Sequence, residues 1–228
     1  MNSNKKTAII VGALFLIAMV TSLVGGVWLE SILTTPDYLR TVSANGSQVI
    51  TGVLLELINC VAVVGIAVAM FPIFRKQNEA LALGYVAFRV IEAAVLIAAV
   101  ISPLLLIALS QEYITVSASD APFFETLGTL ILNARLALTG LLVPVFFSLG
   151  ALLFYDLLYQ SRLVPRFIPI WGFIGVVAVL TWNLLETFGL SISAGMVFGL
   201  PIILNEIFLG IWLIIKGFDA PKMALEFA

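Results

Sequence analysis

Long, unbroken runs of apolar residues recur along this chain, and short polar segments separate them. About 20 apolar residues in a helix cross the roughly 30 Å hydrocarbon core of a bilayer, because a helix rises about 1.5 Å per residue. The apolar positions are continuous rather than alternating, which argues against the strands of a membrane barrel. We therefore predict an all-α, polytopic membrane protein that is a bundle of six transmembrane helices. Their expected ranges are about 8–29, 49–74, 80–109, 126–155, 168–189 and 197–216.

The composition also indicates a chain that is surrounded by lipid. Of its 228 residues, 62% are hydrophobic and only 11% are charged, whereas a soluble domain is about one quarter charged. The first apolar stretch follows Lys5 and Lys6, as in a signal peptide. It is longer than the apolar region of a signal peptide and has no small-residue cleavage pattern after it. We expect it to remain as the first helix of a single membrane domain, residues 1–228.

The distribution of positive charge predicts the orientation in the membrane. Lysine and arginine are enriched in cytoplasmic loops. Arg40 is the only such residue in the loops of one side. The other side carries eight: Lys5, Lys6, Arg75, Lys76, Arg162, Arg166, Lys216 and Lys222. We therefore predict that both termini are cytoplasmic.

Residues that the chain lacks exclude several chemistries. It contains no histidine, which removes serine–histidine–aspartate triads, histidine-ligated haem and the usual zinc sites. Cys60 is the only cysteine, so one chain can form neither a disulfide nor a cysteine cluster. No glycine-rich phosphate loop or basic tract is present. We expect no metal, no cofactor and no nucleic acid partner; the expected partners are the lipid bilayer and a small cationic or polar ligand.

Polar residues nevertheless lie inside five of the six apolar stretches. A charge at the bilayer centre costs about 2.5–3.5 kcal/mol on insertion scales, so such side chains usually face the bundle interior and find partners there. We therefore expect Arg135, near mid-membrane, to lie within hydrogen-bonding reach of Glu56, Glu92 or Glu206. The ten polar positions are Glu56, Asn59, Arg89, Glu92, Asn133, Arg135, Asn183, Glu186, Asn205 and Glu206.

Spacing and depth predict where these side chains meet. Residues three apart share one face of a helix, and this spacing relates Glu56 to Asn59, Arg89 to Glu92, and Asn183 to Glu186. Depths estimated at about 1.5 Å per residue describe a polar shaft that is open outward and closed toward the cytoplasm. The predicted pocket residues are Glu56, Asn59, Arg89, Glu92, Arg135, Asn183, Glu186, Asn205 and Glu206.

The charge balance of this shaft leaves three interpretations open. Four glutamates oppose two arginines, so either some glutamates are protonated or a cation completes the balance. The first interpretation is a binding or transport protein for a small solute, cation or lipid. The second is a structural or regulatory membrane component whose buried charges fix helix packing. The third is an intramembrane enzyme that uses paired glutamates as acid and base. A cavity of about 300 Å³ or more would favour the first over the second.

Four segments resemble a group of bacterial membrane proteins, the domain of unknown function 4386 family. They are KKTAIIVGALFLIAMV at residues 5–20, FRVIEAAV at 88–95, RLVPRFIPIWGFIG at 162–175 and NEIFLGIWLIIKG at 205–217. On this resemblance, Arg89 and Glu92 match the motif of the third helix, and Glu206 matches that of the sixth. The resemblance implies six helices and a multi-pass protein of the bacterial inner (plasma) membrane. It implies no activity.

Overall fold

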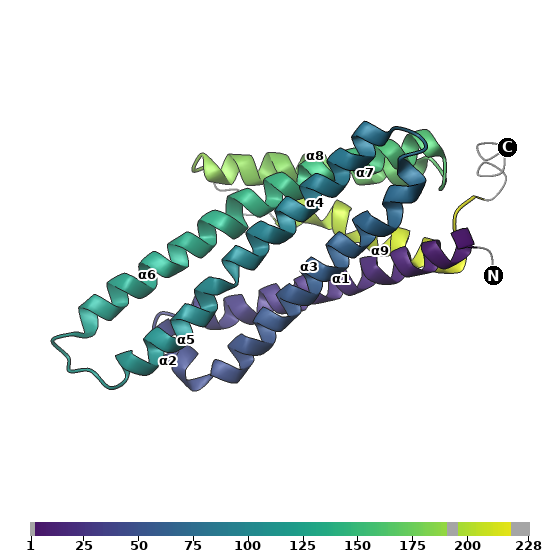
Figure 1. Ribbon diagram of the computed structural model, residues 1–228. Coiled ribbons are helices and arrows are strands. Elements are labelled where there is room, and N and C mark those ends of the chain that lie inside the picture. The colour runs from purple at the N-terminus through teal and green to yellow at the C-terminus, as the bar shows by residue number, and fades with distance from the viewer. Residues whose placement is uncertain (1–2, 191–195, 220–228) are drawn as a thin grey trace.

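The computed structural model describes residues 3–190 and 196–219, and their regular elements are all helical (Figure 1). Nine α-helices and one π-helical turn, η1, are found within these ranges. In chain order they are α1 (Ser3–Leu33), α2 (Tyr38–Ala44), α3 (Gly46–Phe74), α4 (Glu79–Ala99), α5 (Ile101–Tyr113), α6 (Ala121–Ala137), η1 (Leu138–Leu142), α7 (Val143–Ser161), α8 (Phe167–Thr187) and α9 (Met196–Ile215).

Six helical segments of the described chain are long and apolar enough to cross a membrane. Four of them are α1, α3, α8 and α9, and the other two are composite: α4 with α5, and α6 with η1 and α7. The predicted all-α, six-span fold is confirmed. The beginning of α1 and the end of α9 lie at the same end of the bundle, where Gly12 packs against Gly210. The cytoplasmic position of this end stays a prediction, and Lys222 lies outside the described residues.

Both composite spans are interrupted close to a proline. Pro103 has no N–H with which to bond the carbonyl four residues earlier, on Ala99, and the helix breaks at Val100 between α4 and α5. Pro144 likewise leaves the carbonyl of Gly140 without its usual donor, and Gly140 lies in the π-helical turn η1. The predicted stretches 80–109 and 126–155 are therefore each broken near their middle.

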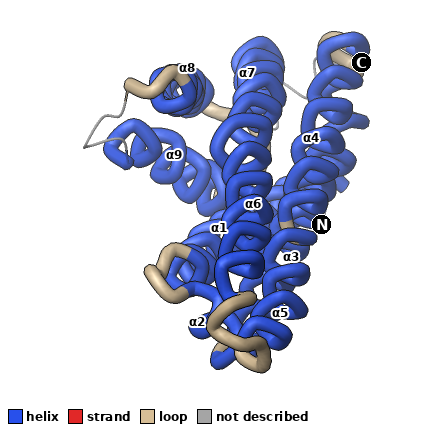
Figure 2. Tube along the Cα trace, turned by 90° about the vertical axis from the view of Figure 1, so that its left-hand side faces the viewer, coloured by secondary structure: helices blue, strands red, loops and turns tan. Residues whose placement is uncertain are grey.

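The spans differ in length, and this difference shapes the molecule. α8 and α9 have 21 and 20 residues, or about 30 Å each, enough for one hydrocarbon core. The composite spans have 35 and 41 residues. Figure 2 shows α8 and α9 beside α7 at one end, with α2 and α5 at the other. The long helices thus continue past the α8–α9 pair at the end remote from the termini, which we call the outer end.

Two separate hydrophobic cores hold the bundle together. The inner core, toward the termini, includes Phe15, Phe74, Tyr85, Phe154 and Tyr155, and the rings of Phe74, Tyr85 and Phe154 lie with centroids 5.4–6.0 Å apart. The outer core is aliphatic and joins the ends of α1, α2, α3 and α5. Its buried residues are Leu29, Ile32, Leu33, Leu39, Val42, Val49 and Leu106. The buried charges lie on the helix segments between these cores.

Candidate functional site

An ion pair between two distant helices lies between the two cores. Glu56 on α3 accepts two hydrogen bonds from Arg135 on α6, at 2.6 Å from Nη2 to Oε1 and 3.2 Å from Nη1 to Oε2. Both residues are buried, at 6% and 8% exposure. A bidentate arginine–carboxylate pair is among the strongest charge-assisted contacts. Arg135 was expected to face the interior within reach of Glu56, Glu92 or Glu206, and its contact with Glu56 confirms this expectation.

The broken helix α4–α5 contributes to the same contact. Nη1 of Arg135 also donates to the carbonyl oxygen of Ala99, at 3.2 Å. That oxygen is the one that Pro103 leaves without its normal backbone donor. Arg135 therefore joins three helical segments, α3, α4 and α6, and supplies a donor to a buried carbonyl at the helix break.

A second ion pair, Arg89 with Glu92, lies within α4. Nη1 of Arg89 donates to Oε2 of Glu92 at 2.9 Å, and Nε of Arg89 is buried without a hydrogen-bond partner. The guanidinium lies 5.1 Å from the ring centroid of Phe147 and 5.7 Å from that of Tyr85, so aromatic faces replace part of its polar surroundings. Gly150 on α7 leaves room for it, since a Cβ there would come within 3.4 Å of Nε.

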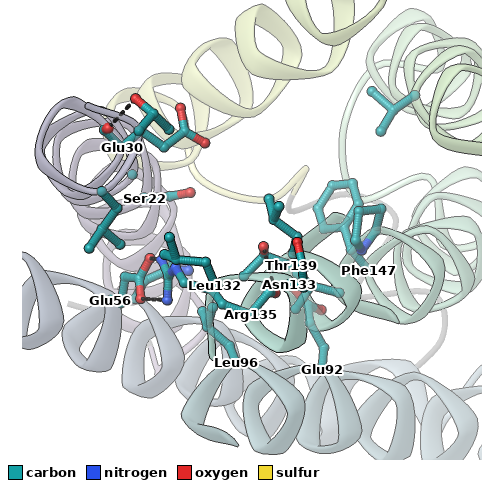
Figure 3. Close-up of a pocket in the computed structure, with 18 of the residues that line it drawn as sticks. Ser22, Glu30, Glu56, Glu92, Leu96, Leu132, Asn133, Arg135, Thr139 and Phe147 are labelled. Carbon is teal, nitrogen blue, oxygen red and sulfur yellow. Dashed lines mark hydrogen bonds and ion pairs between the residues drawn. The ribbon is translucent and has the colours of Figure 1, made fainter. Parts of the chain in front are cut away.

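A cavity of about 580 Å³, which we call the outer cavity, opens above the Glu56–Arg135 pair. Its floor is formed by buried Glu56, Glu92 and Arg135. In Figure 3, Ser22 and Glu30 of α1 lie at one side of the space and Phe147 of α7 at the other. The cavity has apolar walls and a charged floor, as many small-molecule sites do.

A smaller cavity of about 220 Å³, the inner cavity, adjoins the outer one. Ser22, Asn59, Glu92 and Phe147 line both cavities. The inner cavity adds Arg89 and the half-buried Glu206 of α9, which forms no ion pair within the described part of the chain. Glu92 and Asn59 therefore lie at the junction of the two spaces.

Three of the predicted pocket residues line neither cavity. Asn205 is fully buried and accepts from Tyr155 Oη at 2.8 Å while donating to the carbonyl of Ile168 at 2.9 Å, so it joins α7, α8 and α9. Asn183 donates to the carbonyl of Val179 in its own helix at 2.9 Å. Glu186 is exposed near the end of α8. The structure thus brings together Glu56, Asn59, Arg89, Glu92, Arg135 and Glu206.

The sequence reasoning missed the contribution of α1. Ser22, Gly26 and Glu30 of α1, and Thr34 just after its end, all line the outer cavity. They are spaced four residues apart in the chain, a spacing that keeps residues of a helix near one face. This stripe of small and polar residues on an otherwise apolar helix is the signal that could have revealed them. Asn133 was recognised as an intramembrane polar residue but not included among the pocket residues, and it also lines this cavity.

The sequence profile of one family, described as a domain of unknown function (DUF4386), matches residues 10–217. The chain belongs to the DUF4386 family. The match covers all six spans almost completely, including the parts of the chain that carry both ion pairs and both cavities. No curated protein and no solved structure matches this DUF4386 chain. Within its described residues, no three acidic or cysteine side chains form a group that could hold a metal ion.

Proposed function

We propose that this membrane protein binds a small cationic or polar ligand in the outer cavity. The observation that carries the proposal is the cavity itself, which at about 580 Å³ exceeds the roughly 300 Å³ of the smallest usual ligand sites. Its floor offers Glu92 and its rim offers Glu30, Asn133 and Thr34 as polar groups for a ligand.

Charge favours a cationic ligand over an anionic one. The two cavities together are lined by four glutamates and two arginines. Arg135 is already engaged by Glu56, and Arg89 by one oxygen of Glu92. Glu206 and the second oxygen of Glu92 remain without a positive partner among the described residues. A bound cation would balance this surplus, and the low dielectric of the membrane interior would strengthen the attraction.

A purely structural role is the second candidate, and one observation favours it for part of the site. The Glu56–Arg135 pair has good geometry, is deeply buried and joins three helical segments. Such a pair can fix helix packing without any ligand. We therefore assign Glu56 and Arg135 to architecture and Glu92 to ligand binding.

The test is thermal stability of the purified protein in detergent, titrated with tetramethylammonium and small primary amines. A ligand present at about 100 times its dissociation constant stabilises the folded state by about 2.7 kcal/mol, which raises the melting temperature by roughly 5–10 °C for a chain of this size. The variant Glu92→Gln should remain folded and lose most of this rise. The matched control is Glu112→Gln, an exposed carboxylate that lines neither cavity.

The same titration can contradict the proposal. Wild-type protein that no cation or amine stabilises would leave the structural role as the better account. An equal rise in wild type, Glu92→Gln and Glu112→Gln would show that cations act on the protein surface and not in the cavity.

A further inference from the structure

The outer cavity is a groove with a buried floor and exposed edges. Glu56 and Arg135 on the floor are buried, whereas Ser22 and Glu30 on the α1 edge and Leu136 on the α6 edge are exposed. Leu136 has 63% of its surface accessible. The space is therefore reached from the side of the bundle, between α1 and α6, as well as from its outer end.

The lengths of the helices explain this side opening. α1 packs against α3 and α9, and α6 packs against α5 and η1, so the two edges of the groove are not in close contact with each other. α8 and α9 are short, and Val179 is the only one of their described side chains that lines the outer cavity. In the described chain, the outer part of the groove faces the surroundings of the bundle, which for a membrane-spanning helix is lipid.

The walls of the groove suit an alkyl chain. Leu33, Leu96, Leu132, Leu136, Phe147 and Val179 surround the space above the charged floor. A ligand that is wholly polar would place its polar groups against these apolar side chains, whereas an alkyl chain would cover them without burying polar groups. A polar or cationic head, in contrast, matches the carboxylate of Glu92 at the deep end.

From these observations we infer that the ligand is a single-chain cationic amphiphile, with an ammonium head and one alkyl tail, that enters sideways from the bilayer between α1 and α6. This inference rests on the proposed function and specifies its ligand class and entry route. The head lies near Glu92 at the junction of the two cavities, and the tail lies along the leucines of the groove.

The experiment uses the full chain in lipid nanodiscs and a long-chain trimethylammonium probe with a photoreactive diazirine in its alkyl tail. After illumination, the adducts are located by mass spectrometry. We expect labelling on Leu132, Leu136 and Leu33, and we expect unlabelled dodecyltrimethylammonium to suppress it, while dodecanoate, with a similar tail and a negative head, leaves it unchanged. Leu83, which is 59% exposed and lines neither cavity, reports non-specific labelling from lipid.

A variant pair tests the entry route. Leu136→Trp places a larger side chain at the opening, and we expect groove labelling to fall about tenfold, which corresponds to about 1.4 kcal/mol of lost affinity. Leu83→Trp is the matched control and should leave labelling unchanged. The melting temperature of each variant without ligand, compared with that of wild type, shows whether both variants fold.

The outcomes separate this inference from the proposed function. If tetramethylammonium stabilises the protein but groove labelling equals that of Leu83 or resists competition, the inference of an amphiphilic ligand is wrong and the proposed cation site stands. If dodecanoate competes as well as dodecyltrimethylammonium, the inferred preference for a cationic head is wrong. If neither stabilisation nor competed labelling occurs, both proposals fail.

Discussion

Each of the two buried ion pairs of this protein joins one arginine to one glutamate, and the two pairs differ in what surrounds them. Glu56 and Arg135 are 79 residues apart in the chain and meet through two hydrogen bonds, and Arg135 also donates to the carbonyl of Ala99. Arg89 and Glu92 are three residues apart on α4 and share one hydrogen bond, and Nε of Arg89 has no partner. In the first pair both oxygens of the glutamate thus accept from the arginine. In the second pair one oxygen of Glu92 and Nε of Arg89 have no partner in the pair, and both residues line cavities.

This difference separates an architectural role from a binding role. Only the Glu56–Arg135 pair connects helices that are distant in sequence, so its loss would loosen the bundle. The Arg89–Glu92 pair connects no two helices, and Glu92 lies at the junction of the outer and inner cavities. A charge with an unused oxygen on the wall of a cavity can accept a ligand, whereas a carboxylate held through both oxygens is less available.

The largest expected effect follows from removing Arg135. Arg135→Met leaves the carboxylate of Glu56 buried without its partner, and breaking a buried pair in this way costs about 3–5 kcal/mol. The double variant Glu56→Leu with Arg135→Met removes both charges, so we expect it to recover most of that loss. The measurement is thermal stability in detergent. A single variant as stable as wild type would mean that Glu56 does not need a charged partner, and the architectural role would be wrong.

Smaller losses of stability are expected at the second pair. Arg89→Met or Glu92→Leu leaves one charge without its partner, at a cost of about 1–3 kcal/mol. We expect a smaller loss than at the first pair because only one hydrogen bond is removed and that bond joins no two helices. The two substitutions together should give a stable protein that no longer responds to tetramethylammonium or amines. A stable double variant that keeps its full response would show that the pair is packing alone.

The same contrast shows what the sequence could predict. The six spans follow from apolar length, because the thickness of the bilayer admits few alternatives. The interior position of Arg135 follows from the cost of placing its charge in lipid. Its choice of Glu56 over Glu92 or Glu206 was not predictable, because that choice depends on how α3 and α6 pack across the bundle.

Features that depend on three-dimensional packing were missed. The spacing of Asn183 and Glu186 suggested a shared inward face, yet Glu186 is exposed near the end of α8, which packs against η1, α7 and α9. Asn205 was taken as a pocket residue, but the partners that satisfy it belong to α7 and α8. Sequence spacing gives the face of one helix and not the identity of the helix that covers it.

The smallest expected effect tests whether Arg135 serves the break at Pro103. Pro103→Ala restores an N–H that can bond the carbonyl of Ala99, which in wild type already accepts from Arg135. We therefore expect Pro103→Ala to change the free energy of unfolding of wild type by no more than about 1 kcal/mol. In the Arg135→Met background, where that carbonyl has lost its donor, we expect Pro103→Ala to stabilise by about a further 0.5–1.5 kcal/mol. A double-mutant cycle of thermal stabilities isolates this coupling.

Pro201→Ala in α9 is the matched control, since the carbonyl four residues before it, on Val197, accepts nothing from Arg135, and its cycle should give no coupling. Equal coupling in both cycles would mean that Arg135 stabilises the bundle as a whole. The hydrogen bond to the carbonyl of Ala99 would then not be a feature that separates the Glu56–Arg135 pair from the Arg89–Glu92 pair.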